Sequence, residues 1–126
     1  MFEEADLIHR YTRAQAIEDG VLIDVSTVAR EAGITYPVAL TRAAWGRCVT
    51  VPPGVECQDE AGRLWDVLFL LALAIRRSDG GPEVHFGVHV RDSNREGMPP
   101  LVRLKAVCGP GDQGEPVVTV MLRDED

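Results

Sequence analysis

The sequence predicts an α+β fold, in which about four helices pack on one face of a small antiparallel sheet of three to four strands. Three observations support this prediction. The chain has 126 residues, 45% of them hydrophobic, which suits one domain with its own core over residues 1–126. Apolar residues recur at helical spacing in the first half of the chain. In the second half they alternate with polar residues, as they do in strands.

The N-terminal third predicts two helices around a short strand. Apolar residues recur at helical spacing over residues 7–19, and Gly20 ends the pattern. Residues 21–25 (VLIDV) are short and rich in β-branched side chains, which favours a strand. Ser26 or Thr27 can then cap a brief helix that Gly33 stops.

Two further helices are expected before the strand-rich half. Proline suits the first turn of a helix, so we predict one from Pro37 to about Cys48. A longer helix is predicted over residues 58–77, with acids at its start and arginines at its end. Its centre is apolar on all sides, so we place it in the middle of the core. The side chains expected to pack against the sheet are Trp65, Leu68, Phe69 and Leu71.

Three strands are predicted over residues 83–91, 101–108 and 116–123. Each has a two-residue period, and the connections between them are rich in glycine and proline. Alternation directs Val84, Phe86, Val88 and Val90 of the first strand toward the core.

The outward positions of these strands carry basic side chains on an acidic protein. The formal charge is −7, yet the outward set consists of His85, His89, Arg91, Arg103, Lys105 and Arg123. One interpretation is an ordinary solvated sheet face. The other is a site for an anion or an acidic partner, in which Gly87 exposes the backbone between two histidines. His85 and His89 would lie about 13 Å apart on a strand, too far to share one metal ion, so we predict no metal site.

Composition narrows the possible partners and compartments. The isoelectric point near 4.9 does not favour nucleic acid, since non-specific DNA binding depends on neutralised phosphates. The longest apolar run, residues 67–75, is too short to span a membrane. The acidic N-terminus differs from a secretory signal, and three widely spaced cysteines fit reduced thiols. We therefore expect a cytoplasmic protein.

One segment is similar to a helix-turn-helix. Residues 25–35 place Ala29, Gly33 and Ile34 where that motif needs a small residue, a turn glycine and a core residue. The second helix would then cover residues 36–42, which offer few side chains able to pair with base edges. DNA binding through residues 26–45 is kept as an alternative.

No catalytic constellation is evident. Asp24 and Asp66 lie among apolar neighbours, where a buried carboxylate can act as an acid or base. Each also has a structural interpretation, since Asp24 lies beside capping residues and Asp66 can face Arg63 one turn earlier. A small enzyme that uses one of these carboxylates and a sheet histidine is a second alternative.

Four segments carry a resemblance to a known family. They are residues 17–26 (IEDGVLIDVS), 33–41 (GITYPVALT), 58–68 (QDEAGRLWDVL) and 104–118 (LKAVCGPGDQGEPVV). Together they resemble an uncharacterised bacterial protein family, a domain of unknown function found in chromosomes, plasmids, phages and other mobile elements. The resemblance implies a bacterial, cytoplasmic, single-domain protein, and it brings no activity, cofactor or catalytic residue.

The leading hypothesis is a non-enzymatic accessory protein that binds another macromolecule, with a setting in mobile elements or in defence and counter-defence. A protein partner is expected, and no cofactor and no membrane association are expected. The sequence leaves the oligomeric state open.

Overall fold

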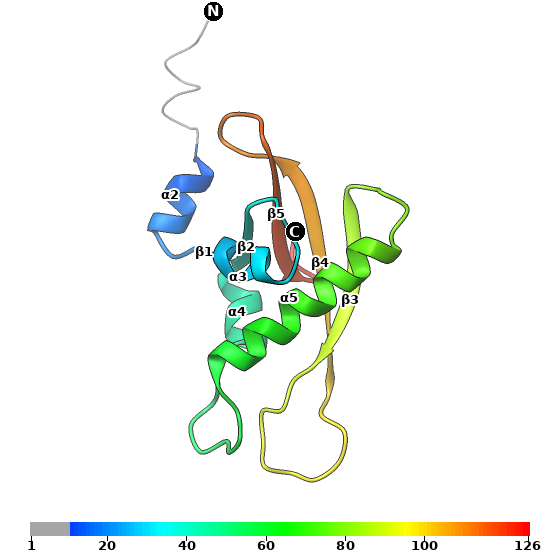
Figure 1. The fold of residues 1–126 in the computed structure, drawn as a ribbon. Helices are drawn as coiled ribbons and strands as arrows, with labels where there is room; N and C mark the ends of the chain where they lie inside the picture. The colour runs from blue at the N-terminus through cyan, green and yellow to red at the C-terminus, as the bar shows by residue number, and fades with distance from the viewer. Residues whose placement is uncertain (1–10) are drawn as a thin grey trace, which may run out of the picture.

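The fold is seen in a computed structural model, which describes residues 11–126 (Figure 1). Within that range four helices and five strands follow one another along the chain. Their order is α2 (Arg13–Glu18), β1 (Leu22–Asp24), α3 (Ser26–Glu31), β2 (Val38–Thr41), α4 (Arg42–Cys48), α5 (Glu60–Arg77), β3 (Glu83–His89), β4 (Leu101–Pro110) and β5 (Pro116–Leu122). The mixed α+β class is confirmed, as are the short first strand, the brief helix before Gly33, the long helix and the three C-terminal strands.

The sheet has five strands in the order β1-β2-β5-β4-β3. Strands β2 and β5 are parallel, and the other neighbours are antiparallel. The prediction of a wholly antiparallel sheet of three to four strands was therefore wrong in both respects. Strand β2, from the first half of the chain, pairs with β5, the last strand. The hydrophobic periodicity of the sequence does not reveal a pairing between such distant segments.

The helix predicted from Pro37 to Cys48 is a strand followed by a shorter helix. Val38–Thr41 forms β2 between β1 and β5, and the carbonyl of Pro37 accepts a hydrogen bond from the Val118 N–H at 2.9 Å. Proline thus precedes a strand instead of opening a helix. The helix α4 begins one residue after Thr41, whose hydroxyl accepts a hydrogen bond from the Ala44 N–H at 3.1 Å.

Helix α5 lies diagonally across one face of the sheet and buries only part of its surface (Figure 1). Asp59 caps its start, and the Leu68 and Leu71 side chains are fully buried, as predicted. Trp65 and Phe69, in contrast, are 39% and 48% exposed, and their rings stack at 6.3 Å. The prediction that these two aromatic side chains pack in the core was wrong, because they occupy the side of α5 that turns away from the sheet.

Helices α3, α4 and α5 pack on the face of the sheet that carries Leu40, Leu104 and Val120. Helix α2 lies on the other side. The Arg13 guanidinium donates to the Thr119 hydroxyl at 2.7 Å, and Thr119 alternates with core residues along β5. The expectation that all helices share one face was therefore only partly correct. The N-terminal part of the predicted helix 7–19 lies outside the described residues.

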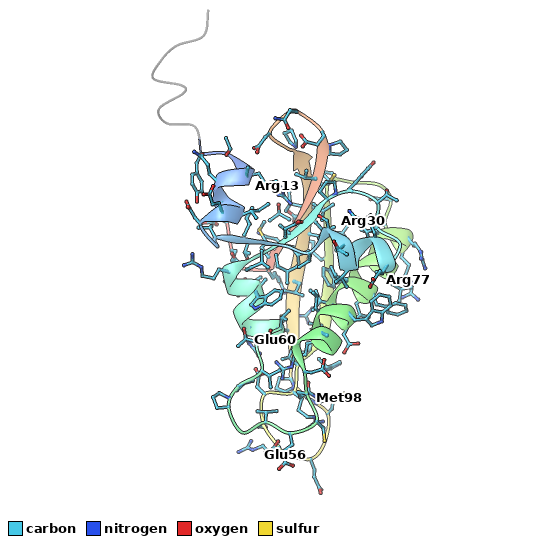
Figure 2. All side chains as sticks on the ribbon, turned by 60° about the vertical axis from the view of Figure 1, so that its left-hand side comes forward. Arg13, Arg30, Glu56, Glu60, Arg77 and Met98 are labelled. Atoms are coloured by element: carbon cyan, nitrogen blue, oxygen red, sulfur yellow. The ribbon has the colours of Figure 1, made fainter. Side chains whose placement is uncertain are left out.

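A buried arginine closes the lower end of the molecule. Arg63 is 6% exposed, and its guanidinium donates to the Thr50 carbonyl at 3.0 Å, to the Asp92 carboxylate at 3.1 Å and to the Arg91 carbonyl. These hydrogen bonds link α5 to the segment between α4 and α5 and to the segment between β3 and β4. The two segments lie side by side below the sheet (Figures 1 and 2). The predicted pairing of Arg63 with Asp66 does not form, since Asp66 is on the exposed side of α5.

Candidate interaction site

Strand register brings four of the predicted basic residues together on the outward face of the sheet. His85 of β3 lies opposite Lys105 of β4, and Arg103 is two residues earlier on that same strand. The Arg123 N–H, just beyond β5, donates to the Arg103 carbonyl at 3.1 Å. We call His85, Arg103, Lys105 and Arg123 the cationic face.

The charges of the cationic face are only slightly compensated. Within residues 11–126, no ion pair involves Arg103, Lys105 or Arg123. The His85 Nε2 atom lies 2.6 Å from a carboxylate oxygen of Glu83, which is the acid at this edge of the face. The two arginine side chains are exposed and Lys105 is partly buried, so both guanidinium groups are accessible to an anion.

A shallow hollow separates these side chains. It encloses about 440 Å³ and is lined in part by His85, Leu101, Arg103 and Arg123. Leu101 is 46% exposed and lies against Gly87, where a Cβ atom would be only 2.9 Å from Leu101 Cδ1. Gly87 therefore makes room for an apolar side chain between cationic ones. Guanidinium groups bind carboxylates in a bidentate manner, so this surface can recognise a segment that is both acidic and apolar.

His89 and Arg91 were predicted for the same surface, but the structure commits them to the neighbouring loop. His89 Nδ1 lies 2.8 Å from the Pro99 carbonyl oxygen. Arg91 lies beyond the end of β3 and donates to the carbonyls of Arg95 and Gly97. Both side chains hold the connection between β3 and β4, and they are not part of the cationic face.

The helix-turn-helix expected around Gly33 is not formed. Helix α3 and the glycine are present, with a φ of +96° at Gly33, but the second helix is replaced by the strand β2. Residues 38–41 pair with strands on both sides, so this segment presents no recognition helix.

The two carboxylates considered for catalysis are exposed and lie apart from the histidines. Asp24 accepts hydrogen bonds from the Ser26 hydroxyl at 2.6 Å and from its N–H at 3.2 Å, which forms an Asx turn at the start of α3. It belongs to β1, whereas His85 belongs to β3 at the opposite edge, about 19 Å away for five strands. Asp66 lies on α5, on the other side of the sheet from His85. The structure therefore brings neither Asp24 nor Asp66 close to His85.

The chain's three cysteines are free thiols. Burial raises the pKa of the Cys48 thiol to about 11, so Cys48 acts as a small core residue. Across the described part of the chain, no three His, Cys, Asp or Glu side chains gather closely enough to hold a metal ion. No helix in that part is long and apolar enough to cross a membrane.

Sequence reasoning missed Leu101 and the position of β3 at the edge of the sheet. Leu101 is a large apolar residue at an outward position of the predicted strand 101–108. An apolar side chain at such a position could have indicated a contact surface. The edge position depends on strand order, and the sequence carries no direct signal for it.

These features define a small mixed α+β domain whose sheet carries the cationic face on its outward side, with Arg103, Lys105 and Arg123 in no ion pair within residues 11–126. The model of a family of unknown function, DUF6573, matches residues 1–126, and the chain belongs to that family. No curated protein matches the chain significantly, and no solved structure does.

Proposed function

We propose that this protein is a non-enzymatic accessory protein that binds an acidic, partly apolar segment of another protein through the cationic face. The observation that carries the proposal is the grouping of Arg103, Lys105 and Arg123, which have no ion-pair partner within residues 11–126.

Two properties of the surface favour a protein partner. Leu101 adds an exposed apolar contact beside the charges, and mixed apolar and arginine-rich surfaces are typical of protein interfaces. The chain as a whole carries a charge of −7, which repels the extended polyanionic surface of a nucleic acid.

The setting we propose is the bacterial cytoplasm, in a mobile-element or defence and counter-defence context. This part rests on the resemblance of four segments to a family found in such elements. The binding proposal does not depend on it.

Affinity capture with three baits tests the proposal. The baits are the native protein, Arg103→Glu with Lys105→Glu, and a control with Arg30→Glu and Arg77→Glu. The control changes the net charge by the same amount on α3 and α5, where both arginines are exposed on the helical side of the sheet (Figure 2). Each capture is carried out twice, once from an untreated lysate and once from a lysate treated with nuclease.

We expect a stoichiometric protein that the native and control baits retain and the Arg103→Glu, Lys105→Glu bait loses. High salt should weaken its binding, because the contacts are partly electrostatic. A partner that all three baits retain equally would exclude the cationic face as its binding surface. Retention of nucleic acid alone, before nuclease treatment, would replace the protein partner with a nucleic acid.

A further inference from the structure

Strand β3 is an edge of the sheet, and its free side is accessible. It has seven residues, Glu83–His89, and within residues 11–126 it pairs with β4 alone. Figure 1 shows it as the outermost strand on the side that the C-terminal end of α5 reaches. Because an unpaired edge presents main-chain donors and acceptors to solvent, natural sheets usually shorten, twist or cover it.

The strand register identifies which main-chain groups of β3 point away from β4, toward the free edge of the sheet. Cys108 N–H donates to the Pro82 carbonyl at 2.7 Å, and Val90 N–H donates to the Pro100 carbonyl at 3.0 Å. The hydrogen-bonded positions of this antiparallel pair are therefore the even-numbered ones. The N–H and carbonyl groups of Glu83, His85, Gly87 and His89 point away from β4.

Most of the features that protect edge strands are missing from β3, whose one acidic side chain is Glu83. Its seven residues (EVHFGVH) contain no proline and no lysine, and they pair with β4 without a bulge. Beside the strand, a groove of about 470 Å³ separates it from α5 and is lined by Leu70, Leu73 and Ala74 of that helix. Apolar side chains of an added strand would enter this groove.

We propose that two copies of this chain associate through their β3 strands, which pair antiparallel about a two-fold axis at Phe86. An axis at Phe86, the midpoint of β3, pairs all seven residues. It also places the N–H and carbonyl groups that point away from β4 opposite the same kind of groups in the second copy. This arrangement gives about eight main-chain hydrogen bonds between the two β3 strands. The two sheets then form one continuous sheet.

The side chains are complementary in this register. On the outward face, Glu83 faces His89 of the second copy and His85 faces Gly87, so a carboxylate meets an imidazole and no like charges are opposed. On the helical face, Phe86 meets its own copy at a non-hydrogen-bonded position, where cross-strand side chains are closest. Phe86 is partly buried within one chain and packs at the margin of its core, so it has surface left to bury. This self-complementarity favours a second copy over an unrelated strand.

The pairing has a consequence for the proposed function. It joins two cationic faces across one seam, so that a dimer presents two equivalent binding sites on the same side of a sheet. The inference itself does not depend on the identity of the partner, and its test uses the purified chain alone.

The mass of the native chain in solution is the first measurement. Light scattering after size exclusion, at micromolar concentrations, should give twice the 13.8 kDa of one chain. His85→Pro removes an outward N–H without removing a bond to β4, which an edge strand tolerates. It should raise the dimer dissociation constant by about 100-fold, because symmetry removes two hydrogen bonds. His85→Ala keeps the N–H and should remain a dimer.

Cross-linking tests the register and also covers the case in which His85→Pro does not fold. On a Cys57→Ser background, which removes the exposed thiol, Phe86→Cys should oxidise to a disulfide-linked dimer, since the paired Cα atoms would lie about 4.5 Å apart. Val84→Cys should not, because symmetry separates its copies by about 13 Å. A native chain that stays monomeric at all concentrations would overturn the proposal. Equal cross-linking at both positions, or at neither, would overturn it as well.

Discussion

Strand β1 forms one edge of the sheet with three residues, and β3 forms the other with seven. The short edge has α2 packed beside it, whereas the free side of the long edge faces a groove. In the part of the chain that the structure describes, the sheet therefore has one edge with a helix beside it and one edge with no strand or helix paired to it. The difference places self-association at β3.

An arginine fixes the chain near each edge, and the two differ in burial. Arg13 is partly buried, and it donates to Thr119 and to the Val118 carbonyl. Burial lowers its pKa, and the nearby carboxylates of Asp24, Asp112 and Glu115 oppose that effect. Arg63 is almost fully buried and holds the segment that follows β3. Arg13 thus anchors α2, the helix beside β1, to the central strand β5, whereas Arg63 fixes the segment that follows β3.

The largest effect on stability is expected at Arg63. Arg63→Met keeps much of the aliphatic packing but leaves the Thr50 and Arg91 carbonyls and Asp92 without this donor. We expect the free energy of unfolding to fall by about 3–5 kcal/mol, because each hydrogen bond from a charged donor contributes about 1.5–3 kcal/mol; the fall is measured by urea denaturation. Arg77→Met, on an exposed residue in the last turn of α5, is the matched control and should change it by less than about 0.5 kcal/mol. Equal effects of the two substitutions would show that Arg63 does not close this end of the fold.

A smaller effect is expected from alkaline pH, through Cys48 at the end of α4. Its pKa is about 11 in the folded chain, against an ordinary value of 9.0 for the exposed thiol of an unfolded chain. The protonated thiol therefore contributes stability that is complete below the unfolded pKa and is lost as pH rises to about 11. We expect a loss of about 2–3 kcal/mol over that range, measured by urea denaturation at several pH values.

Cys48→Ala is the control for this pH dependence. The substitution removes the titrating thiol, so the part of the slope that the native chain owes to Cys48 should disappear. An unchanged slope would mean that Cys48 is not protected by burial, and that the packing at this end is looser than the structure indicates.

The smallest of these effects is expected at the covered edge. Arg13→Met loses two hydrogen bonds of a partly buried guanidinium, so we expect a loss of about 1–2 kcal/mol. Amide exchange should accelerate in α2 and β1 and stay unchanged in α5. Acceleration spread evenly over the chain would contradict a local role for Arg13 at the β1 edge.

The sequence predicted the elements whose patterns are local. The long helix, with Asp59 before it and arginines at its end, and the alternating C-terminal strands follow from composition and periodicity. The prediction was wrong for the residues after Pro37. The strand Val38–Thr41 has only four residues, which are too few to show a period, and proline can precede either a helix or a strand. The aromatic pair on α5 was misplaced, since hydrophobicity alone does not show which side of an apolar helix faces solvent.

The candidate site was predictable only in part. Alternation placed His85, Arg103, Lys105 and Arg123 on the outward face of the sheet, but strand register decided which of them meet, and Arg91 lies beyond the end of β3. His85 and Lys105 lie opposite each other through pairing between separate strands, and His89 is drawn away by a carbonyl of the following loop. The open edge of β3 depends on strand order, which is set by contacts between distant parts of the chain.

Amide hydrogen exchange along β3 is the most direct test of the claim that this edge pairs with a second copy. It is measured by NMR on the native chain at a low and a high protein concentration. We expect the outward-pointing amides of His85 and Gly87 to exchange rapidly when dilute and to become protected at high concentration, while Phe86 and Val88, bonded to β4, stay protected throughout. Rapid exchange at His85 and Gly87 at both concentrations would contradict the account.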